Sequence, residues 1–210
     1  MSSQTFSISA APGTDVWRKP PSTTIFNAPT APPPSGATRT APLSSFLSAR
    51  ISFSFPFSSA AQYDQGGLLL SFRPRSTTTS PSAIPPRWIK TGVEFYNSAP
   101  RLSTVNCENW ADWSVGDRSP DVGEKGGEEK VWTTVSVEKQ GDHHGPSFWV
   151  FRVLEDGTKV PLREITWIYG GGDEEVGKWE LTVEALAARP DKEVSSELVV
   201  EFRDFEVEWA

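Results

Sequence analysis

Apolar and polar side chains alternate along residues 47–58, which predicts a β-strand with one buried and one solvent-facing side. The apolar positions of this run are Leu47, Ala49, Ile51, Phe53, Phe55 and Phe57. The polar positions are Ser48, Arg50, Ser52, Ser54, Pro56 and Ser58. Because successive side chains of a strand point to opposite faces, the whole run fits one half-buried strand.

The same period of two recurs in the second half of the chain. Residues 131–138 and 179–185 alternate in this way. Residues 148–154 and 160–168 predict a hairpin, because the Glu-Asp-Gly-Thr turn at 155–158 separates them.

The last run changes parity part-way along. Leu198, Val200 and Phe202 share one face, but the apolar residues after Asp204 fall on the other, so we expect a β-bulge near Arg203 or Asp204.

Helix signals are scarce: residues 184–189 predict a short helical turn that Pro190 would end. About ten strands at regular spacing are typical of an all-β, antiparallel two-sheet β-sandwich.

Three polar or proline-rich segments interrupt the strand pattern. Residues 27–42 predict a polyproline-like loop, because prolines cannot donate a continuous hydrogen-bond ladder. Residues 73–86 predict a Ser/Thr/Pro hairpin extension, and the charged and glycine-containing residues 119–130 predict a third excursion. None has the character of a linker between two cores, so we expect residues 1–210 to form a single domain with loop insertions.

The run at residues 88–95 offers the most informative candidate surface. Period-two alternation places Ile89, Val93 and Phe95 on the core side. Trp88, Lys90 and Glu94 fall on the opposite side. An aromatic ring, a cation and a carboxylate on one face suit a polar ligand, whose identity the pattern leaves open.

Composition narrows the classes of partner. The chain carries 20 basic and 27 acidic side chains, for a formal net charge of −7, which disfavours nucleic acid and anionic membranes as partners. No run approaches the roughly 18 apolar residues of a membrane span, and no secretory signal is visible, so a cytoplasmic location is expected. Cys107 has no His or second Cys at ligand spacing and is interpreted as a structural thiol.

Five sequence pieces carry a resemblance to a known family. They are APGTDVW at 11–17, YDQGGLLL at 63–70, WIKTGVEF at 88–95, DWSV at 112–115 and the terminal VEFRDFEV at 200–207. Together they resemble the family named after "regulation of enolase protein", a fungal and bacterial group with a concanavalin A-like lectin/glucanase fold. The resemblance implies a jelly roll with a concave sheet that often binds ligands in that superfamily.

The resemblance also implies a set of candidate ligand-binding residues, because its recurring polar and aromatic motif positions can be carried over. They are Asp15, Trp17, Tyr63, Asp64, Gln65, Trp88, Lys90, Glu94, Asp112 and Trp113.

A purely structural role is the alternative for several of them. Trp17 and Trp113 could cap the core, and Asp64 and Gln65 could tie down the strand-entry turn before the glycine pair at 66–67.

Catalytic and metal motifs are weak. The Glu-x-Asp-x-x-Glu motif that retaining glucanases of this superfamily share is absent, and residues 201–206 have the wrong carboxylate spacing. His143 and His144 are adjacent in a turn, so we expect their rings to point apart and to share no metal easily. No cofactor is indicated.

The sequence therefore favours a non-hydrolytic binding protein for a small polar or saccharide-like ligand. One alternative is a regulatory protein-protein interaction module. Another is a small-molecule isomerase or cyclase that uses Lys90 and Glu94 as acid and base.

Overall fold

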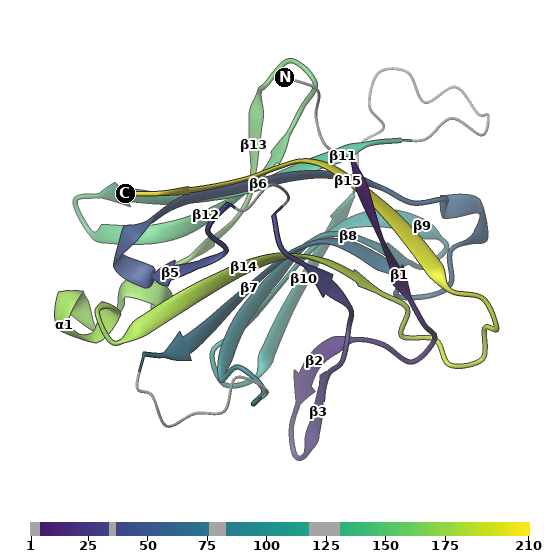
Figure 1. The fold of residues 1–210 in the computed structure, drawn as a ribbon, viewed down its shortest axis with the longest axis horizontal. Helices are drawn as coiled ribbons and strands as arrows, with labels where there is room; N and C mark the ends of the chain where they lie inside the picture. Colours follow the sequence, from purple (N-terminus) through teal and green to yellow (C-terminus); the bar gives the residue numbers. More distant parts are fainter. Residues whose placement is uncertain (1–4, 34–36, 76–82, 118–130) are drawn as a thin grey trace.

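The computed structural model describes residues 5–33, 37–75, 83–117 and 131–210. Two antiparallel β-sheets face each other and form a sandwich, which confirms the predicted fold class (Figure 1). The first sheet has six strands in the order β1 (Phe6–Ala10), β15 (Leu198–Trp209), β6 (Phe46–Ser54), β11 (Thr133–Asp142), β12 (Gly145–Val153) and β13 (Lys159–Ile165).

The second sheet carries the candidate surface. Its order is β10 (Ala111–Asp117), β9 (Ala99–Cys107), β8 (Arg87–Tyr96), β7 (Gln65–Pro74), β14 (Trp179–Ala188) and β4 (Thr30–Ala31), and β5 (Thr40–Pro42) also pairs with β14. A separate hairpin of β2 (Val16–Lys19) and β3 (Thr23–Phe26) lies below this sheet in Figure 1. The remaining elements are short helical turns: η2 (Leu43–Ser45), η3 (Phe57–Ser59), η4 (Trp167–Tyr169) and α1 (Gly172–Val176).

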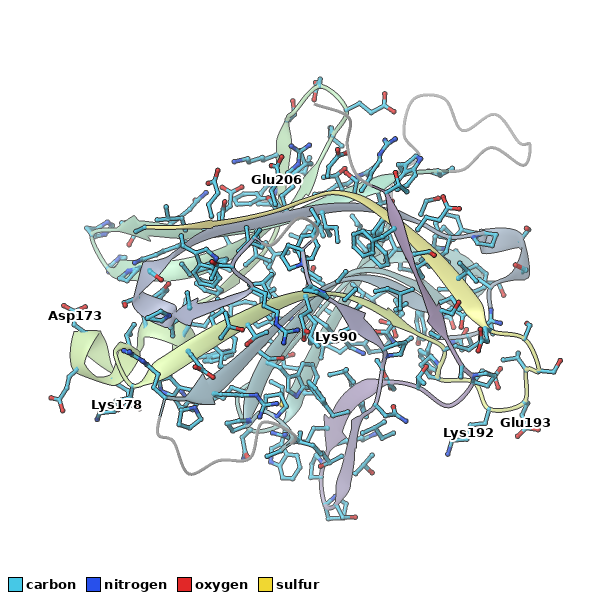
Figure 2. All side chains as sticks on the ribbon, viewed as in Figure 1. Lys90, Asp173, Lys178, Lys192, Glu193 and Glu206 are labelled. Atoms are coloured by element: carbon cyan, nitrogen blue, oxygen red, sulfur yellow. The ribbon has the colours of Figure 1, made fainter. Side chains whose placement is uncertain are left out.

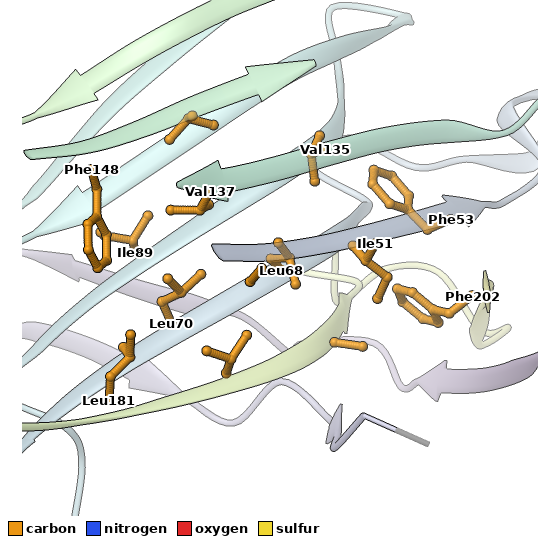
Figure 3. Packing of buried hydrophobic residues seen from close by; sticks show 14 of the residues in the cluster. Ile51, Phe53, Leu68, Leu70, Ile89, Val135, Val137, Phe148, Leu181 and Phe202 are labelled. Atoms are coloured by element: carbon orange, nitrogen blue, oxygen red, sulfur yellow. The ribbon is translucent and has the colours of Figure 1, made fainter. Parts of the chain in front are cut away.

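The main core lies between the two sheets, where the apolar sides of the alternating strands meet. Figure 3 shows Ile51 of β6 close to Leu68 of β7, and Phe53 of β6, Leu70 of β7 and Ile89 of β8 belong to the same cluster. Burial of these side chains removes apolar surface from water, which is the main driving force for folding. The predicted face of Ile89 and Val93 is confirmed, because both belong to this cluster.

Several sequence predictions hold at the level of single elements. The hairpin around residues 155–158 is formed by β12 and β13, and its turn is closed by Leu154 N donating to Thr158 O at 2.9 Å. The bulge in β15 is also confirmed. Its pairing with β6 shifts register between Arg203 and Glu206, and Asp204 adopts a φ of 51°.

The helical turn expected at residues 184–189 is wrong. β14 remains a strand to Ala188, since Ala188 pairs with Gln65 of β7 and Ala185 and Ala187 pack into the core. Sheet pairing therefore overrides the local preference of an alanine-rich run for helix. The one α-helix among the described residues is α1, five residues long.

The loop expected at residues 27–42 is only partly a loop. Its two ends form β4 and β5, which pair with the edge of β14. An edge strand does not need every N–H for its ladder, so the prolines here are tolerated. Of the other expected insertions, residues 76–82 and 118–130 lie outside the described residues.

Three aromatic or aliphatic positions depart from the predicted faces. Leu47 is 42% exposed, Phe57 lies in the turn η3 rather than in β6, and Phe95 is only partly buried and belongs to neither core cluster. All three lie at or near strand ends, where period-two alternation no longer coincides with the core. Within the described ranges, no helix is long and apolar enough to cross a membrane.

Candidate functional site

The candidate site lies on the face of the seven-stranded sheet that points away from the main core, which we call the outer face. Strand register arranges this face in rows across β14, β7, β8 and β9. One row is Leu186, Gly67, Gly92 and Ser103. The rows on either side bring Gln65 beside Glu94 and Leu69 beside Lys90.

The β2–β3 hairpin covers part of the outer face. Val16 packs with Leu69, Trp88, Val105 and Leu186 in a second apolar cluster. Arg18 of β2 fixes the hairpin, because its Nη1 and Nη2 donate to the carbonyl oxygens of Pro86 and Pro85 at 2.8 and 3.2 Å.

Trp88 therefore has a packing role. It points to the predicted face but is only 1% exposed beneath the hairpin, so it offers no surface on which a ligand could stack. Cys107 is buried in the same cluster and is free, which agrees with its interpretation as a structural thiol. Trp17 packs against this cluster from the hairpin side.

Lys90 is buried and paired. Its Nζ lies 3.0 Å from Oδ1 of Asp15, which precedes the hairpin strand β2. The same Oδ1 accepts hydrogen bonds from Gln65 Nε2 at 3.3 Å and from the backbone N of Val16 at 2.7 Å. Figure 2 shows Lys90 well inside the molecular outline, whereas Lys178 and Lys192 lie at its periphery. Burial is tolerated because the ammonium has a carboxylate partner.

Glu94 is the second buried charged group of the outer face. Its Oε2 accepts hydrogen bonds from Ser103 Oγ at 2.8 Å and from Trp113 Nε1 at 2.9 Å. Burial raises the pKa of Glu94 above its ordinary value of 4.5, although Lys90 and the two hydrogen bonds oppose the shift.

Between Lys90 and Glu94 lies a small polar hollow, defined by Gln65, Gly67, Lys90, Gly92, Glu94, Ser103 and Leu186. Its volume is about 10 Å³, which holds about one water molecule. The open groove expected from the sequence is therefore not seen here. The hairpin and the buried side chains fill most of the space that an exposed sheet face would leave.

Gly67 and Gly92 form the floor of the polar hollow as a cross-strand pair. A Cβ at Gly67 would lie 2.1 Å from Thr91 O, and a Cβ at Gly92 would lie 2.0 Å from Gly66 O. Only glycine permits the backbones to approach so closely. The two motifs YDQGGLLL and WIKTGVEF thus meet at these glycines.

An aromatic rim borders the polar hollow and consists of Tyr63, Tyr96 and Trp113. The Tyr96 and Trp113 rings meet edge to face with centroids 5.0 Å apart, and the Tyr63 centroid lies 5.8 Å from Tyr96 and 6.4 Å from Trp113. Tyr63 is 41% exposed. The hydrogen bond from Trp113 Nε1 to Glu94 joins the aromatic rim directly to the polar hollow.

Asp64 lies apart from the polar hollow, in a buried ion pair. Arg189 Nη2 lies 2.6 Å from its Oδ2, and both side chains are almost fully buried. Oδ2 also accepts a hydrogen bond from Ala61 N at 2.8 Å, which is the turn-fixing role weighed as the structural alternative for this residue. Both carboxylate oxygens are thus occupied by the protein itself.

Asp112 also lies apart from the other candidates, on the side of the sheet that faces the first sheet. It pairs with Asn106, which lies opposite Ile89 of the main core. Its Oδ2 forms an ion pair with Arg163 of β13. Asp112 therefore links the two sheets at their edge.

Eight of the ten predicted residues are thus brought to the outer face. Asp15, Gln65, Lys90 and Glu94 form its polar network, Tyr63 and Trp113 its rim, and Trp17 part of its cover, while Trp88 lies buried beneath that cover. Sequence reasoning missed Ser103 and Tyr96. Tyr96 directly follows the WIKTGVEF motif, but nothing local marks Ser103, which reaches Glu94 only through the pairing of β8 with β9.

No group of three or more His, Cys, Asp or Glu side chains in the described part of the chain could hold a metal ion. His143 and His144 lie in the exposed turn between β11 and β12. Their rings are 3.8 Å apart between centroids, so the expectation that they point apart is wrong. The turn brings the two side chains to the same side.

The sequence over residues 1–209 matches the family described as "Protein of unknown function (DUF1349)". The chain belongs to this family. It is also 34% identical, over 203 residues, to "Uncharacterized protein AN7484" of Emericella nidulans, covering 97% of this chain and 86% of the relative.

One solved structure is similar over the whole chain. It is a functionally unknown protein from Saccharomyces cerevisiae, with a TM-score of 0.59 and 18% identity, covering 100% of this chain and 92% of that one. At this identity the likeness concerns the fold alone. The outer-face site therefore has to be interpreted from its own geometry.

Proposed function

We propose that this protein binds a small, neutral, polyhydroxylated ligand at the aromatic rim, without hydrolysing it. The observation that carries the proposal is the direct hydrogen bond between partly exposed Trp113 of the rim and buried Glu94 of the polar hollow. Sugar rings combine an apolar face, which packs on aromatic rings, with hydroxyl groups that need polar partners. The rim and the hollow supply these two features side by side.

The size of the polar hollow sets the binding mode. A volume of about 10 Å³ admits one hydroxyl group but no sugar ring. The ring of the ligand would therefore rest on the aromatic rim while one hydroxyl enters the hollow and bonds with Glu94. Such a ligand is held at its edge and stays partly exposed to solvent.

The charges of the site favour a neutral ligand. The charge of Lys90 is balanced by Asp15 at 3.0 Å, so it does not attract an anion strongly. Burial raises the pKa of Glu94 because it disfavours the charged carboxylate, so the site does not attract a cation strongly either. A hydroxyl group both donates and accepts hydrogen bonds, so it can bond with either protonation state of Glu94.

The experiment is a thermal-shift and calorimetric screen with the methyl glycosides of glucose, galactose and mannose. Glucosamine and glucuronate serve as charged counterparts. We expect at least one neutral glycoside to stabilise the wild-type protein and the Glu94→Ala and Trp113→Phe variants to lose this effect, whereas Glu94→Gln should keep part of it because its amide still offers hydrogen bonds. Glu164→Ala is the matched control, because Glu164 accepts a serine hydrogen bond from Ser147 on the other sheet. Absence of any shift at millimolar concentration, or an equal shift in Glu94→Ala, overturns the proposal.

An isomerase or cyclase is the second candidate, favoured by the raised pKa of a buried carboxyl close to Lys90. A carboxyl group of this kind is suited to donate or accept a proton. The same samples distinguish the two functions by chromatography after long incubation. A glycoside recovered unchanged supports binding alone, and conversion that Glu94→Gln abolishes supports an enzyme.

A further inference from the structure

Tyr63 occupies a backbone conformation that its side chain disfavours. Asp64 N donates to Ala61 O at 3.0 Å and closes a four-residue turn in which Tyr63 is the third residue. Its φ is 69°. Turn chemistry prefers Gly or Asn where φ is positive, since there the Cβ of an L-residue lies too close to the backbone, and only a short polar side chain such as that of Asn offsets this by local hydrogen bonding.

The surroundings hold Tyr63 in this conformation. Its N donates to Phe95 O at 2.7 Å, and its O accepts from Gln65 Nε2 at 3.2 Å. The next residue, Asp64, is locked by its buried ion pair with Arg189. Strain at one residue persists only when neighbouring contacts outweigh it, and such residues cluster at functional sites.

Burial does not explain why a tyrosine stands here. The Tyr63 side chain is 41% exposed, so its ring gains only part of the stabilisation that burial provides. Its edge-to-face contact with Trp113 has a centroid separation of 6.4 Å, near the outer limit for such pairs. A glycine would satisfy the turn better but would lose the ring contacts with Tyr96 at 5.8 Å and Trp113 at 6.4 Å.

We infer that Tyr63 is a specificity-determining residue whose strained backbone keeps its ring exposed on the aromatic rim. This inference rests on the proposed function and deepens it. The ring supplies a flat apolar surface, which a cyclic sugar can cover and an acyclic polyol cannot. Tyr63 thus selects cyclic sugars over flexible polyols that carry the same hydroxyl groups.

The experiment compares Tyr63→Gly, Tyr63→Ala, Tyr63→Asn and Tyr63→Phe with the wild-type protein. Each is titrated calorimetrically with the three methyl glycosides and with sorbitol, and its Tm is measured without ligand. We expect the Tm of Tyr63→Gly to lie about 2 to 4 °C above that of Tyr63→Ala, because both variants lack the ring and only alanine keeps the backbone strain. We expect Tyr63→Gly to weaken glycoside binding about tenfold, while sorbitol binding stays the same.

The other variants separate backbone from ring. Tyr63→Asn tolerates positive φ but lacks the ring, so it should behave like Tyr63→Gly, whereas Tyr63→Phe should bind like the wild type. Asp204→Gly is the matched control, because Asp204 has a φ of 51° in β15 of the other sheet. Relief of strain there should leave glycoside binding unchanged.

The outcomes distinguish this inference from the proposed function. If Tyr63→Gly is no more stable than Tyr63→Ala, or if it keeps the preference for glycosides over sorbitol, the role of Tyr63 is overturned while binding itself stands. If the wild-type protein binds none of the glycosides, the proposed function fails and the role of Tyr63 fails with it.

Discussion

Arg189 and Asp64 form a buried ion pair between residues 125 positions apart in the sequence, with Arg189 Nε 3.0 Å from Asp64 Oδ1 and Nη2 2.6 Å from Oδ2. Arg189 Nη1 also donates to Ser196 O at 2.7 Å. The pair thus joins the turn before β7 to the segment after β14. Its two parallel hydrogen bonds match the geometry of a guanidinium and a carboxylate.

Arg189→Ala should destabilise the protein by about 3 to 5 kcal/mol, because it leaves the Asp64 carboxylate buried without its cation. Urea denaturation would measure the loss. Arg39→Ala is the matched control, since Arg39 forms an exposed pair with Glu184 and should change the free energy of unfolding by less than about 1 kcal/mol. Equal losses in the two variants would contradict the structural role of the buried pair.

Trp88→Ala should lower the free energy of unfolding by about 3 to 5 kcal/mol, because it leaves a cavity under the β2–β3 hairpin. Trp110→Ala provides a comparison at a tryptophan that is 41% exposed, and there we expect a small effect. Chemical denaturation of both variants measures the difference. A mild Trp88→Ala phenotype would mean that the hairpin does not cover Trp88 in solution.

Gly92→Ala should destabilise the sheet by about 3 kcal/mol or more, because the new Cβ would lie 2.0 Å from the backbone oxygen of Gly66. Gly116→Ala in β10 is a suitable control, since a Cβ there meets no atom within 4 Å. Thermal denaturation and circular dichroism would report the change. If Gly92→Ala were as stable as Gly116→Ala, the close approach of β7 and β8 would be wrong.

Glu94 should make the protein lose stability as pH rises. Its pKa in the folded state is raised above 4.5, so between that value and the folded-state pKa the folded protein binds more protons than the unfolded chain. The contribution of Glu94 to the free energy of unfolding is therefore greatest below about pH 4.5, and it declines as pH rises through the folded-state pKa. Glu94→Gln should remove this contribution, which the difference in Tm between the two proteins across pH 4 to 8 would reveal. A difference that does not vary with pH would contradict the raised pKa.

The sequence by itself determined many of the strands and the face on which most of their apolar side chains lie. The two-residue period is a local property of an extended backbone. The alternation in residues 47–58 and 88–95 therefore identified β6 and β8, and it placed Ile89 and Lys90 on opposite faces of β8. The bulge at Arg203 and Asp204 was visible for the same reason, as a change of parity. At strand ends, as for Phe95, the period continued beyond the core and the prediction failed.

The tertiary structure decided which of these residues meet. Asp15 reaches Lys90 across 75 residues only because the β2–β3 hairpin folds over the outer face, and the same packing turns Trp88 from a candidate platform into a buried side chain. Asp64 is adjacent to Gln65 in the sequence, but its carboxylate pairs with Arg189 and does not join the polar network of Lys90 and Glu94. Such contacts depend on strand order, register and the closure of long loops, which no local period encodes.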